Sequence, residues 1–216
     1  MSTPVVLHGY HHSVYTWIAR MVLVQADVTF DTVEENPFAD PPVVVRKLHP
    51  FGRVPTLVHD DFVIFETTAI SRYINREFAN DTLTPDCAKA QARMDQVIAI
   101  TDSYGYVPLV RQVFAHAVFR PWEGERVDPE QITAGIDAAR PVLAALDRIA
   151  AEGHVLNAAT ITLADCHLAP MIGYFLQADE GRIVMEDVPA LARWWDLIAH
   201  TPSLVATQPK RGVQST

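Results

Sequence analysis

The spacing of apolar residues changes near residue 80 of this 216-residue chain, and this change limits the folds that the chain can adopt. Before that point, short β-branched runs alternate with stretches of helical spacing, whereas after it only helical spacing recurs. Residues 81–86 (DTLTPD) are polar, contain a proline and show no periodicity, which predicts a linker. We therefore expect an α/β domain over residues 1–80 and an all-helical domain over residues 87–216.

The first domain is expected to begin with a strand, a helix and a second strand, over residues 4–8, 13–26 and 28–33. A βαβ unit of this kind joins parallel strands through a right-handed crossover. Residues 54–65 form two short apolar runs around a His-Asp-Asp turn, which is the pattern of an antiparallel hairpin. Thr67 then opens a helix as its N-cap. The predicted order is βαβ followed by ββα.

The second domain is expected to be a helical bundle. Amphipathic spacing predicts helices near residues 87–118, 130–152, 163–177 and 188–199, with no convincing strand among them. Residues 120–128 (RPWEGERVD) are charged and predict an exposed turn.

Composition excludes several classes of function. The formal net charge of −9, with both signs mixed along the chain, repels phosphate backbones and anionic lipids. Cys87 and Cys166 lie far apart, which argues against a disulfide framework and favours a reducing cytoplasm. No run approaches the ~18 apolar residues that a membrane span needs, and no export signal opens the chain. His11 and His12 are adjacent in a loop and cannot chelate as a helical pair does. We expect no nucleic-acid, membrane or metal partner.

Three segments carry the functional signal, and the first is residues 49–57 (HPFGRVPTL). Pro55 cannot donate to a strand ladder, so it belongs at the start or edge of a strand and leaves the Val54 backbone unpaired. An unpaired edge of this kind suits the capture of a short extended peptide by strand addition. Taken alone, the segment is equally explained by a proline that simply starts an edge strand.

The second segment is residues 65–70 (FETTAI). The helix start at Thr67 offers N–H groups to a carboxylate, while Glu66 can pair with an ammonium group, so a zwitterion fits there. Without its neighbours, the pair is more often a helix cap with a first-turn acid. In the third segment, residues 161–165 (ITLAD), Thr162 is expected to cap a helix with Asp165 bonding back, a structural role. Cys166 follows inside an apolar helix, as a packing residue.

Together these segments resemble motifs of the glutathione transferase superfamily, cytosolic type, over nearly the whole chain. They are similar to N-P-x-G-x-V-P-x-L, E/Q-S-x-A-I and S/T-x-A-D, with His49 in place of asparagine and Thr67 in place of serine. The resemblance implies a thioredoxin-like first domain with Pro55 in cis, and glutathione as co-substrate. It further implies a homodimer in which Phe51 inserts into the partner. The glutathione-binding residues that it implies are Arg53 (favoured over Lys47 for the glycyl carboxylate), Val54, Pro55, Glu66 and Thr67.

A protein of this family activates the glutathione thiol with a hydroxyl or thiol between the first strand and the first helix. Ser13 matches the serine of zeta-like and related bacterial classes, S-x-x-x-W/Y-x-V-R, and ranks first. Tyr15 occupies the cysteine position of beta-class proteins and ranks second, whereas Tyr10 resembles the tyrosine of mu and pi classes but is one residue out of register. Alternatively, Ser13 only caps the helix and Tyr15 only packs. No cysteine lies in this loop, which disfavours thiol-disulfide chemistry.

The second-substrate pocket is expected on the first helix of the helical domain. Tyr104, Tyr106 and Arg111 are candidates for its lining, together with Phe114, although aromatic residues at helical spacing are more often core. The resulting hypothesis is a cytoplasmic enzyme that directs glutathione thiolate at a small electrophile, by conjugation or glutathione-dependent isomerisation. The alternative is a catalytically inactive, dimeric binding or regulatory module of the same fold.

Overall fold

A computed structural model describes residues 4–38 and 47–210 of the chain. Contacts divide these residues into two compact units. Residues 4–38, 47–83 and 205–210 belong to the first unit, and residues 84–204 form the second. The linker expected at residues 81–86 stays a prediction.

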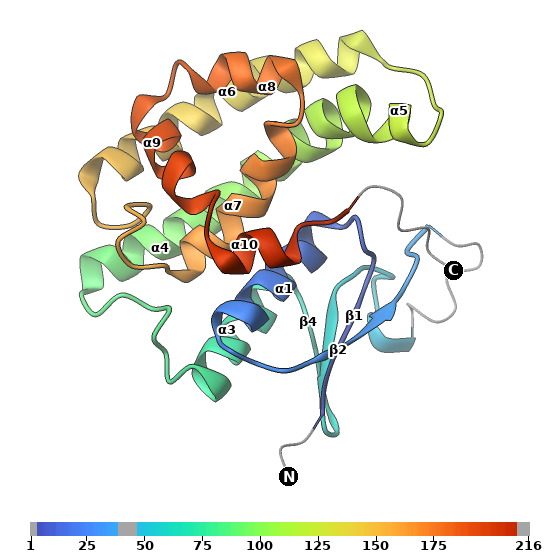
Figure 1. The fold of residues 1–216 in the computed structure, drawn as a ribbon, viewed down its shortest axis with the longest axis vertical. Helices are drawn as coiled ribbons and strands as arrows, with labels where there is room; N and C mark the ends of the chain where they lie inside the picture. The colour runs from blue at the N-terminus through green and yellow to red at the C-terminus, as the bar shows by residue number, and fades with distance from the viewer. Residues whose placement is uncertain (1–3, 39–46, 211–216) are drawn as a thin grey trace. The chain divides into compact units, whose positions relative to one another are not determined.

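The first unit contains a four-stranded mixed sheet with the strand order β2-β1-β3-β4 (Figure 1). Its elements are β1 (Val5–Gly9), α1 (Val14–Gln25), β2 (Asp31–Glu34), β3 (Thr56–His59), β4 (Phe62–Phe65) and α3 (Thr67–Phe78). β1 is parallel to β2 and antiparallel to β3, and β3 is antiparallel to β4. The thioredoxin-like βαβ-ββα order expected from the sequence is therefore confirmed.

Helices α1 and α3 pack together on one face of this sheet (Figure 1). Trp17 and Ile18 of α1 and Ile70 of α3 are buried together with Leu7 and Leu57 of the central strands. Burial of one such side chain contributes about 1.5–3 kcal/mol, as an upper estimate. Because α1 and α3 pack on the sheet through their apolar faces, the N-terminus of each helix is held at one end of the sheet.

β2 begins three residues later than the spacing of residues 28–33 predicted. Helix α1 ends in a Schellman motif, in which the Val28 N–H donates to the Leu23 carbonyl and Asp27 adopts a φ of 55°. Val28 is therefore part of the helix stop. All four residues of β2 are exposed, so β2 has no buried face whose alternation could reveal it in the sequence.

The N-cap of α3 is Glu66, so the prediction that Thr67 would be the cap is wrong. Phe65 is still paired with Thr56 in the sheet, and the helix begins only two residues later, at Thr67. Glu66 makes this turn with a φ of 70° and a ψ of 116°, a conformation that L-residues rarely adopt. Thr67 is consequently the first helical residue, and it is buried.

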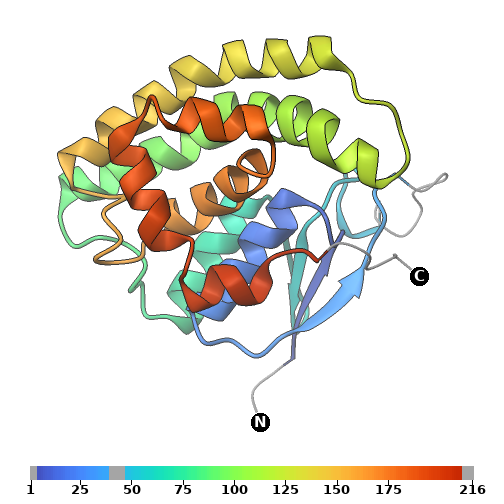
Figure 2. The same cartoon turned by 45° about the horizontal axis from the view of Figure 1, so that its top comes forward.

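The second unit is all-helical over its described residues, as expected (Figure 2). The four predicted stretches correspond to α4 with the π-helix η1 that follows it, to α6, to α7 and to α9. The short helices α5, α8 and α10 were not predicted; α10 ends with three residues that belong to the first unit, and α5 occupies the start of the segment expected to be a turn. The bounds are α4 (Ala88–Ile100), η1 (Thr101–Phe119), α5 (Arg120–Trp122), α6 (Pro129–Glu152), α7 (Leu163–Phe175), α8 (Asp179–Met185), α9 (Pro189–Ile198) and α10 (Pro202–Thr207).

Helix α7 forms the centre of this unit, since all 13 of its residues are buried and it contacts α4, η1 and α9. Its capping box is present as the sequence predicted, with Asp165 accepting from the Thr162 N–H at 2.8 Å and from its hydroxyl at 2.6 Å. The other carboxylate oxygen of Asp165 accepts from Trp194 Nε1 of α9 at 2.7 Å. One buried carboxylate therefore joins two helices. Cys166 is fully buried, as expected, and burial raises the pKa of its thiol well above the ordinary range.

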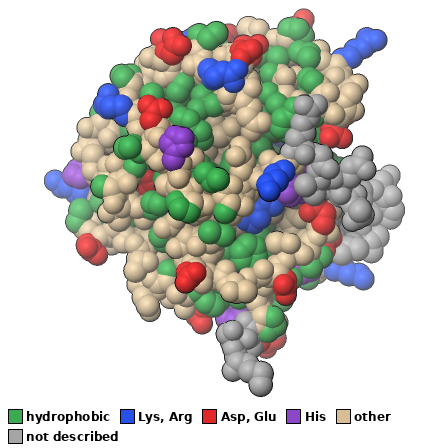
Figure 3. Space-filling view, viewed as in Figure 1, with side chains coloured by type: hydrophobic (Ala, Val, Ile, Leu, Met, Phe, Trp, Pro, Cys, Tyr) green, Lys and Arg blue, Asp and Glu red, His purple; other side chains and the backbone are tan. Residues whose placement is uncertain are grey.

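The surface seen in Figure 3 intersperses acidic and basic side chains with apolar and neutral ones. Within residues 4–38 and 47–210, no helix combines the length and the apolar character that a membrane span requires. The same residues contain no group of three or more His, Cys, Asp or Glu side chains placed to hold a metal ion.

Candidate functional site

Strand register brings the predicted glutathione-site segments of the first unit to one end of the sheet. His8 of β1 pairs with Thr56 of β3, and Thr56 pairs with Phe65 of β4. The chain beyond β1, the Val54–Pro55 peptide before β3 and Glu66 after β4 therefore all lie past the same rung of the ladder. Residues separated by more than forty positions in the sequence meet at this end.

Helices α1 and α3 both begin at this end, because α1 follows β1 and α3 follows β4. The first N–H groups of each helix have no partner within the helix and carry the positive end of its dipole. Two such N-termini favour the binding of a ligand with two negative groups at this end of the sheet.

Ser13 is the N-cap of α1, and its Oγ accepts a hydrogen bond from the Thr16 N–H at 3.3 Å. Its own N–H donates to the Tyr10 carbonyl at 3.0 Å, and its carbonyl accepts from the Trp17 N–H at 2.9 Å. Because Ser13 Oγ acts as an acceptor toward the helix, its hydroxyl proton remains for donation to a ligand. The capping role and a catalytic role are therefore compatible in this geometry.

The two tyrosines near Ser13, Tyr10 of the loop and Tyr15 of α1, are both half-buried. Tyr15 lies in the first turn of α1, two residues beyond Ser13. The Tyr10 ring makes edge-to-face contacts with His12 and Phe38, at centroid distances of 5.8 Å in both cases. Tyr10 is thus part of a small aromatic cluster beside the loop.

The peptide bond between Val54 and Pro55 is cis, as the resemblance implied. Pro55 is buried at the foot of β3 and Val54 is half-buried. Arg53 and Lys47 are both exposed, so each can reach solvent or a ligand carboxylate.

Glu66 lies beside His49, the residue that stands where the family motif has asparagine. His49 Nδ1 accepts from the Phe51 N–H at 3.3 Å, which leaves the ring proton on Nε2, and Nε2 lies 3.8 Å from Glu66 Oε1. Burial lowers the pKa of His49, which favours this neutral form, although Glu66 opposes the shift. The Glu66 side chain is 66% exposed, so its carboxylate is open to a ligand, whereas the neighbouring His49 side chain is buried.

The loop that carries Ser13 is anchored by contacts that the sequence reasoning did not foresee. Glu34 Oε1 of β2 accepts from the His11 N–H at 2.8 Å, and Arg20 Nη2 of α1 donates to the His11 carbonyl at 3.1 Å. Gly9 permits the close approach of this loop to α1, because a Cβ atom there would lie 2.4 Å from Thr16 Cγ2. The motif that ends at Arg20 gave no indication of its bond to His11, and the bond from His11 to Glu34 spans 23 positions of the sequence.

The residues expected around the second substrate all lie on η1. Tyr104 is 67% exposed, Arg111 is exposed and Tyr106 is half-buried, so all three can contact a ligand. Phe114 is buried and stacks on Tyr174 of α7 with a centroid distance of 4.0 Å, which makes it a core residue.

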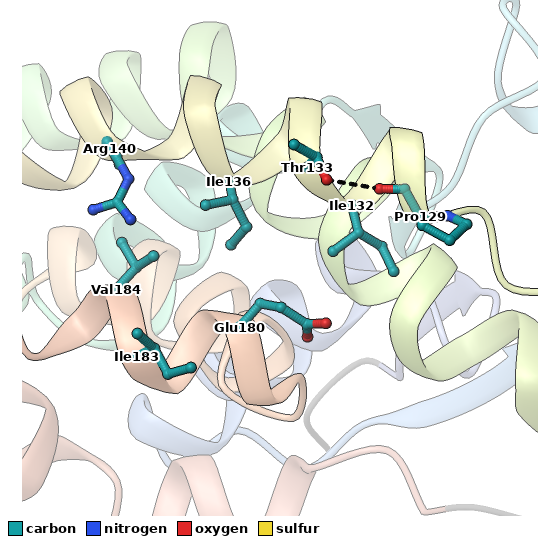
Figure 4. A pocket seen from close by; sticks show the side chains of 8 residues that line it. All are labelled: Pro129, Ile132, Thr133, Ile136, Arg140, Glu180, Ile183 and Val184. Carbon is teal, nitrogen blue, oxygen red and sulfur yellow. Dashed lines mark hydrogen bonds between the residues drawn. The ribbon is translucent and has the colours of Figure 1, made fainter.

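A separate groove of about 330 Å³ lies between α6 and α8 (Figure 4). Its walls are mostly apolar, and Figure 4 shows Arg140 near one end, where Arg140 also pairs with Asp187 at 2.8 Å. The groove is lined by Pro129, Ile132, Thr133, Ile136, Arg140, Glu180, Ile183 and Val184.

The fold and the site define a class of protein in which a thioredoxin-like domain is followed in sequence by an all-helical one. Residues 4–76 match the family model of the glutathione S-transferase N-terminal domain, and residues 129–196 match that of the C-terminal domain. The chain therefore belongs to the glutathione S-transferase superfamily.

Three relatives with 23–24% identity each align over more than nine-tenths of this chain. Glutathione S-transferase F13 of Arabidopsis thaliana is 24% identical, with 92% of this chain and 93% of that protein aligned. The solved structure of glutathione S-transferase III in its apo form superposes with a TM-score of 0.84 at 24% identity and covers 99% of both chains. A theta-class glutathione S-transferase of Xanthomonas axonopodis pv. citri, solved with glutathione bound, gives a TM-score of 0.78 at 23% identity, over 95% of this chain and 97% of that one. These structural likenesses establish the fold.

Proposed function

We propose that this protein is a glutathione transferase, which binds glutathione at the sheet end described above and directs its thiolate at a small electrophile. The observation that carries the proposal is the strand register, which places Ser13, the Val54 backbone and Glu66 past one rung of the sheet. Glutathione is a short extended peptide with an ammonium and a carboxylate at its γ-glutamyl end, a central thiol and a second carboxylate. The site offers a complementary group for each.

The γ-glutamyl end is assigned to the start of α3. Its ammonium pairs with the exposed Glu66 carboxylate, and its carboxylate meets the N–H groups of the helix N-terminus at Thr67. The cysteinyl unit extends along the Val54 backbone beside cis-Pro55 as an added strand. Arg53 takes the glycyl carboxylate, with Lys47 as the second choice.

Ser13 is assigned as the catalytic hydroxyl, with Tyr15 and then Tyr10 as the alternatives. A free thiol titrates near ~8.5, so a transferase working at neutral pH has to stabilise the thiolate. Donation from Ser13 Oγ to the sulfur stabilises it, and the bond that Oγ accepts from Thr16 polarises the hydroxyl further. A thiol pKa lowered by one to two units corresponds to roughly 1.4–3 kcal/mol, which is within reach of a charge-assisted hydrogen bond at a helix N-terminus.

In the reaction, the thiol proton passes to solvent when glutathione binds, and the sulfur lone pair attacks the electrophilic carbon. In conjugation, the new S–C bond forms while the leaving group departs with its bonding electrons. In isomerisation, the addition is reversed after rearrangement and glutathione is regenerated. Tyr104, Tyr106 and Arg111 are proposed to contact the second substrate, and a homodimer through Phe51 is proposed as the assembled form.

Titration with reduced glutathione by isothermal calorimetry tests the binding site. The variant E66A/T67A is expected to bind at least tenfold more weakly, a loss of about 1.4 kcal/mol or more. E77A removes another exposed carboxylate from the same helix and is expected to bind as the unchanged protein does. If the unchanged protein gave no binding heat and no thermal stabilisation with glutathione, the inactive binding module would replace the transferase as the interpretation.

The assignment of the hydroxyl is tested separately with S13A, Y15F and Y10F. S13A is expected to raise the pKa of bound glutathione thiol by about one to two units, followed through the ultraviolet absorbance of the thiolate. Y15F and Y10F are expected to leave that pKa unchanged. A shift in one of the tyrosine variants alone would move the role to that residue.

A further inference from the structure

His11, two residues before Ser13, bonds through its backbone and its ring to three different parts of the first unit. Its N–H donates to Glu34 of β2 at 2.8 Å, and its carbonyl accepts from Arg20 of α1 at 3.1 Å. Its ring Nε2 accepts from the backbone N–H of Lys210 at 3.1 Å, across 199 positions of the sequence. The C-terminal segment is therefore bonded directly to the loop that carries the proposed catalytic hydroxyl.

A second, buried contact joins the same two regions. Thr207 Oγ1 accepts from the indole Nε1 of Trp17 at 3.1 Å, and both side chains are buried. Trp17 also donates its backbone N–H to the Ser13 carbonyl at 2.9 Å. Residues 207–210 thus contact the chain on both sides of Ser13, at His11 before it and at Trp17 after it.

We propose that residues 207–210 form a C-terminal strap that positions Ser13, with His11 as the positioning residue through which the strap acts. The strap touches neither the sulfur nor the second substrate in this scheme. It fixes the loop backbone, and thereby the direction in which Ser13 Oγ presents its proton.

This role is required by the geometry of the donor. A charge-assisted hydrogen bond weakens steeply as its angle and length depart from the optimum, and a displacement of about 1 Å can cost about a hundredfold in rate. The N-cap bond from Thr16 fixes Ser13 Oγ toward the helix, but it does not fix the backbone position of residues 10–12, which depends on other contacts. The bonds of His11 to Glu34, Arg20 and Lys210 determine that backbone position.

Two pairs of variants test the strap, and the inference rests on the proposed function of Ser13. K210P removes the N–H that donates to His11, whereas K210A removes the same side chain and keeps the N–H. H11F keeps a ring but removes the acceptor, whereas H11Q offers an amide oxygen near the position of Nε2. The readouts are the pKa of bound glutathione thiol, from the ultraviolet absorbance of the thiolate, and glutathione affinity by calorimetry.

K210P and H11F are each expected to raise the thiol pKa by about 0.5–1 unit, which lowers the thiolate fraction about three- to tenfold below that pKa. K210A and H11Q are expected to retain the unchanged value. Glutathione affinity, measured at a pH below the thiol pKa of the unchanged complex, is expected to change less than twofold in all four variants. The strap would be overturned if K210P had the same thiol pKa as K210A and if H11F had the same thiol pKa as H11Q. If the unchanged protein itself did not lower the thiol pKa of bound glutathione, the proposed function would be wrong instead. The failure of the strap and the failure of the proposed function are therefore distinguishable.

Discussion

At the scale of single residues, the protonation state of His11 decides whether the strap bond exists. Its Nε2 can accept from the Lys210 N–H only while that nitrogen carries no proton. Burial lowers the pKa of His11, and the positive charges of Arg20 and His12 lower it further, whereas the negative charge of Glu34 raises it. The net direction is downward, so the accepting form is favoured at neutral pH.

This shift makes folding stability depend on pH. His11 has a lower pKa in the folded chain than its ordinary 6.5, so below that value the unfolded chain takes up the proton first. We expect the stabilisation to be fully present above pH 6.5 and to be lost as the pH falls through the folded-state pKa. H11Q has no titrating group there and should show a shallower fall of the unfolding free energy between about pH 7.5 and pH 5 in urea titrations. Identical slopes for H11Q and the unchanged protein would contradict this expectation.

Residue identity indicated candidate site residues, which stay predictions, but it did not indicate the geometry around them. Ser13, Pro55 and Glu66 were recognisable because each stands in a short motif with a local physical reason. His11 was considered only as a metal ligand, because its three partners lie 9 to 199 positions away in the sequence. The capping of α3 was misjudged because a threonine before a helix favours the N-cap, whereas the turn out of β4 puts Glu66 at that position with positive φ.

At the scale of elements, the start of α7 depends on one buried carboxylate. Asp165 is fully buried, which raises its pKa, while its bonds to Thr162 and Trp194 act in the opposite direction. Those bonds also fix the helix start against α9. The Thr162 N–H and the Trp194 indole would lose their acceptor together if the carboxylate were removed.

We therefore expect D165A to lower the unfolding free energy by about 3–5 kcal/mol, because it leaves buried donors unsatisfied. T162S keeps the hydroxyl and both partners of the capping box and should cost less than about 1 kcal/mol. Urea denaturation followed by circular dichroism measures both. A cost for D165A no greater than that for T162S would show that the capping box does not secure α7.

Long elements with clear periodicity were predictable, and short or exposed ones were not. The spacing over residues 130–152 and 163–177 located α6 and α7 within two residues at each end. Helices α8 and α10, with 7 and 6 residues, offer too few turns for a periodic pattern to emerge. The omission of α10 concealed the strap, since Thr207 is the last residue of that helix.

At the scale of the whole molecule, the sequence indicated two kinds of folding unit but could not place the end of the chain. Residues 205–210 group with the first unit, although they follow the helices of the second. Contacts such as Trp17 to Thr207 depend on tertiary structure alone. The acidic and basic residues that are mixed along the sequence are also mixed on the face of the surface shown in Figure 3.

The proposed homodimer makes a prediction for the surface around Phe51. This side chain is 72% exposed, and its ring lies 5.9 Å from that of His49 and 6.3 Å from that of Phe65, centroid to centroid. An aromatic side chain supported by other rings and open to solvent is suited to insertion into a partner's pocket. We expect F51S to weaken dimerisation at least tenfold, about 1.4 kcal/mol, measured by sedimentation equilibrium.

Leu197 provides the matched control, because it is an apolar side chain that is 61% exposed on α9. L197S removes a comparable exposed apolar group and should leave the association constant unchanged. Equal weakening in both variants would point to a general effect of surface hydrophobicity, and a monomeric unchanged protein at micromolar concentration would remove the homodimer from the proposal. If only F51S dissociates, its thiol pKa with bound glutathione should remain low, because the contacts that hold Ser13 all lie within one chain.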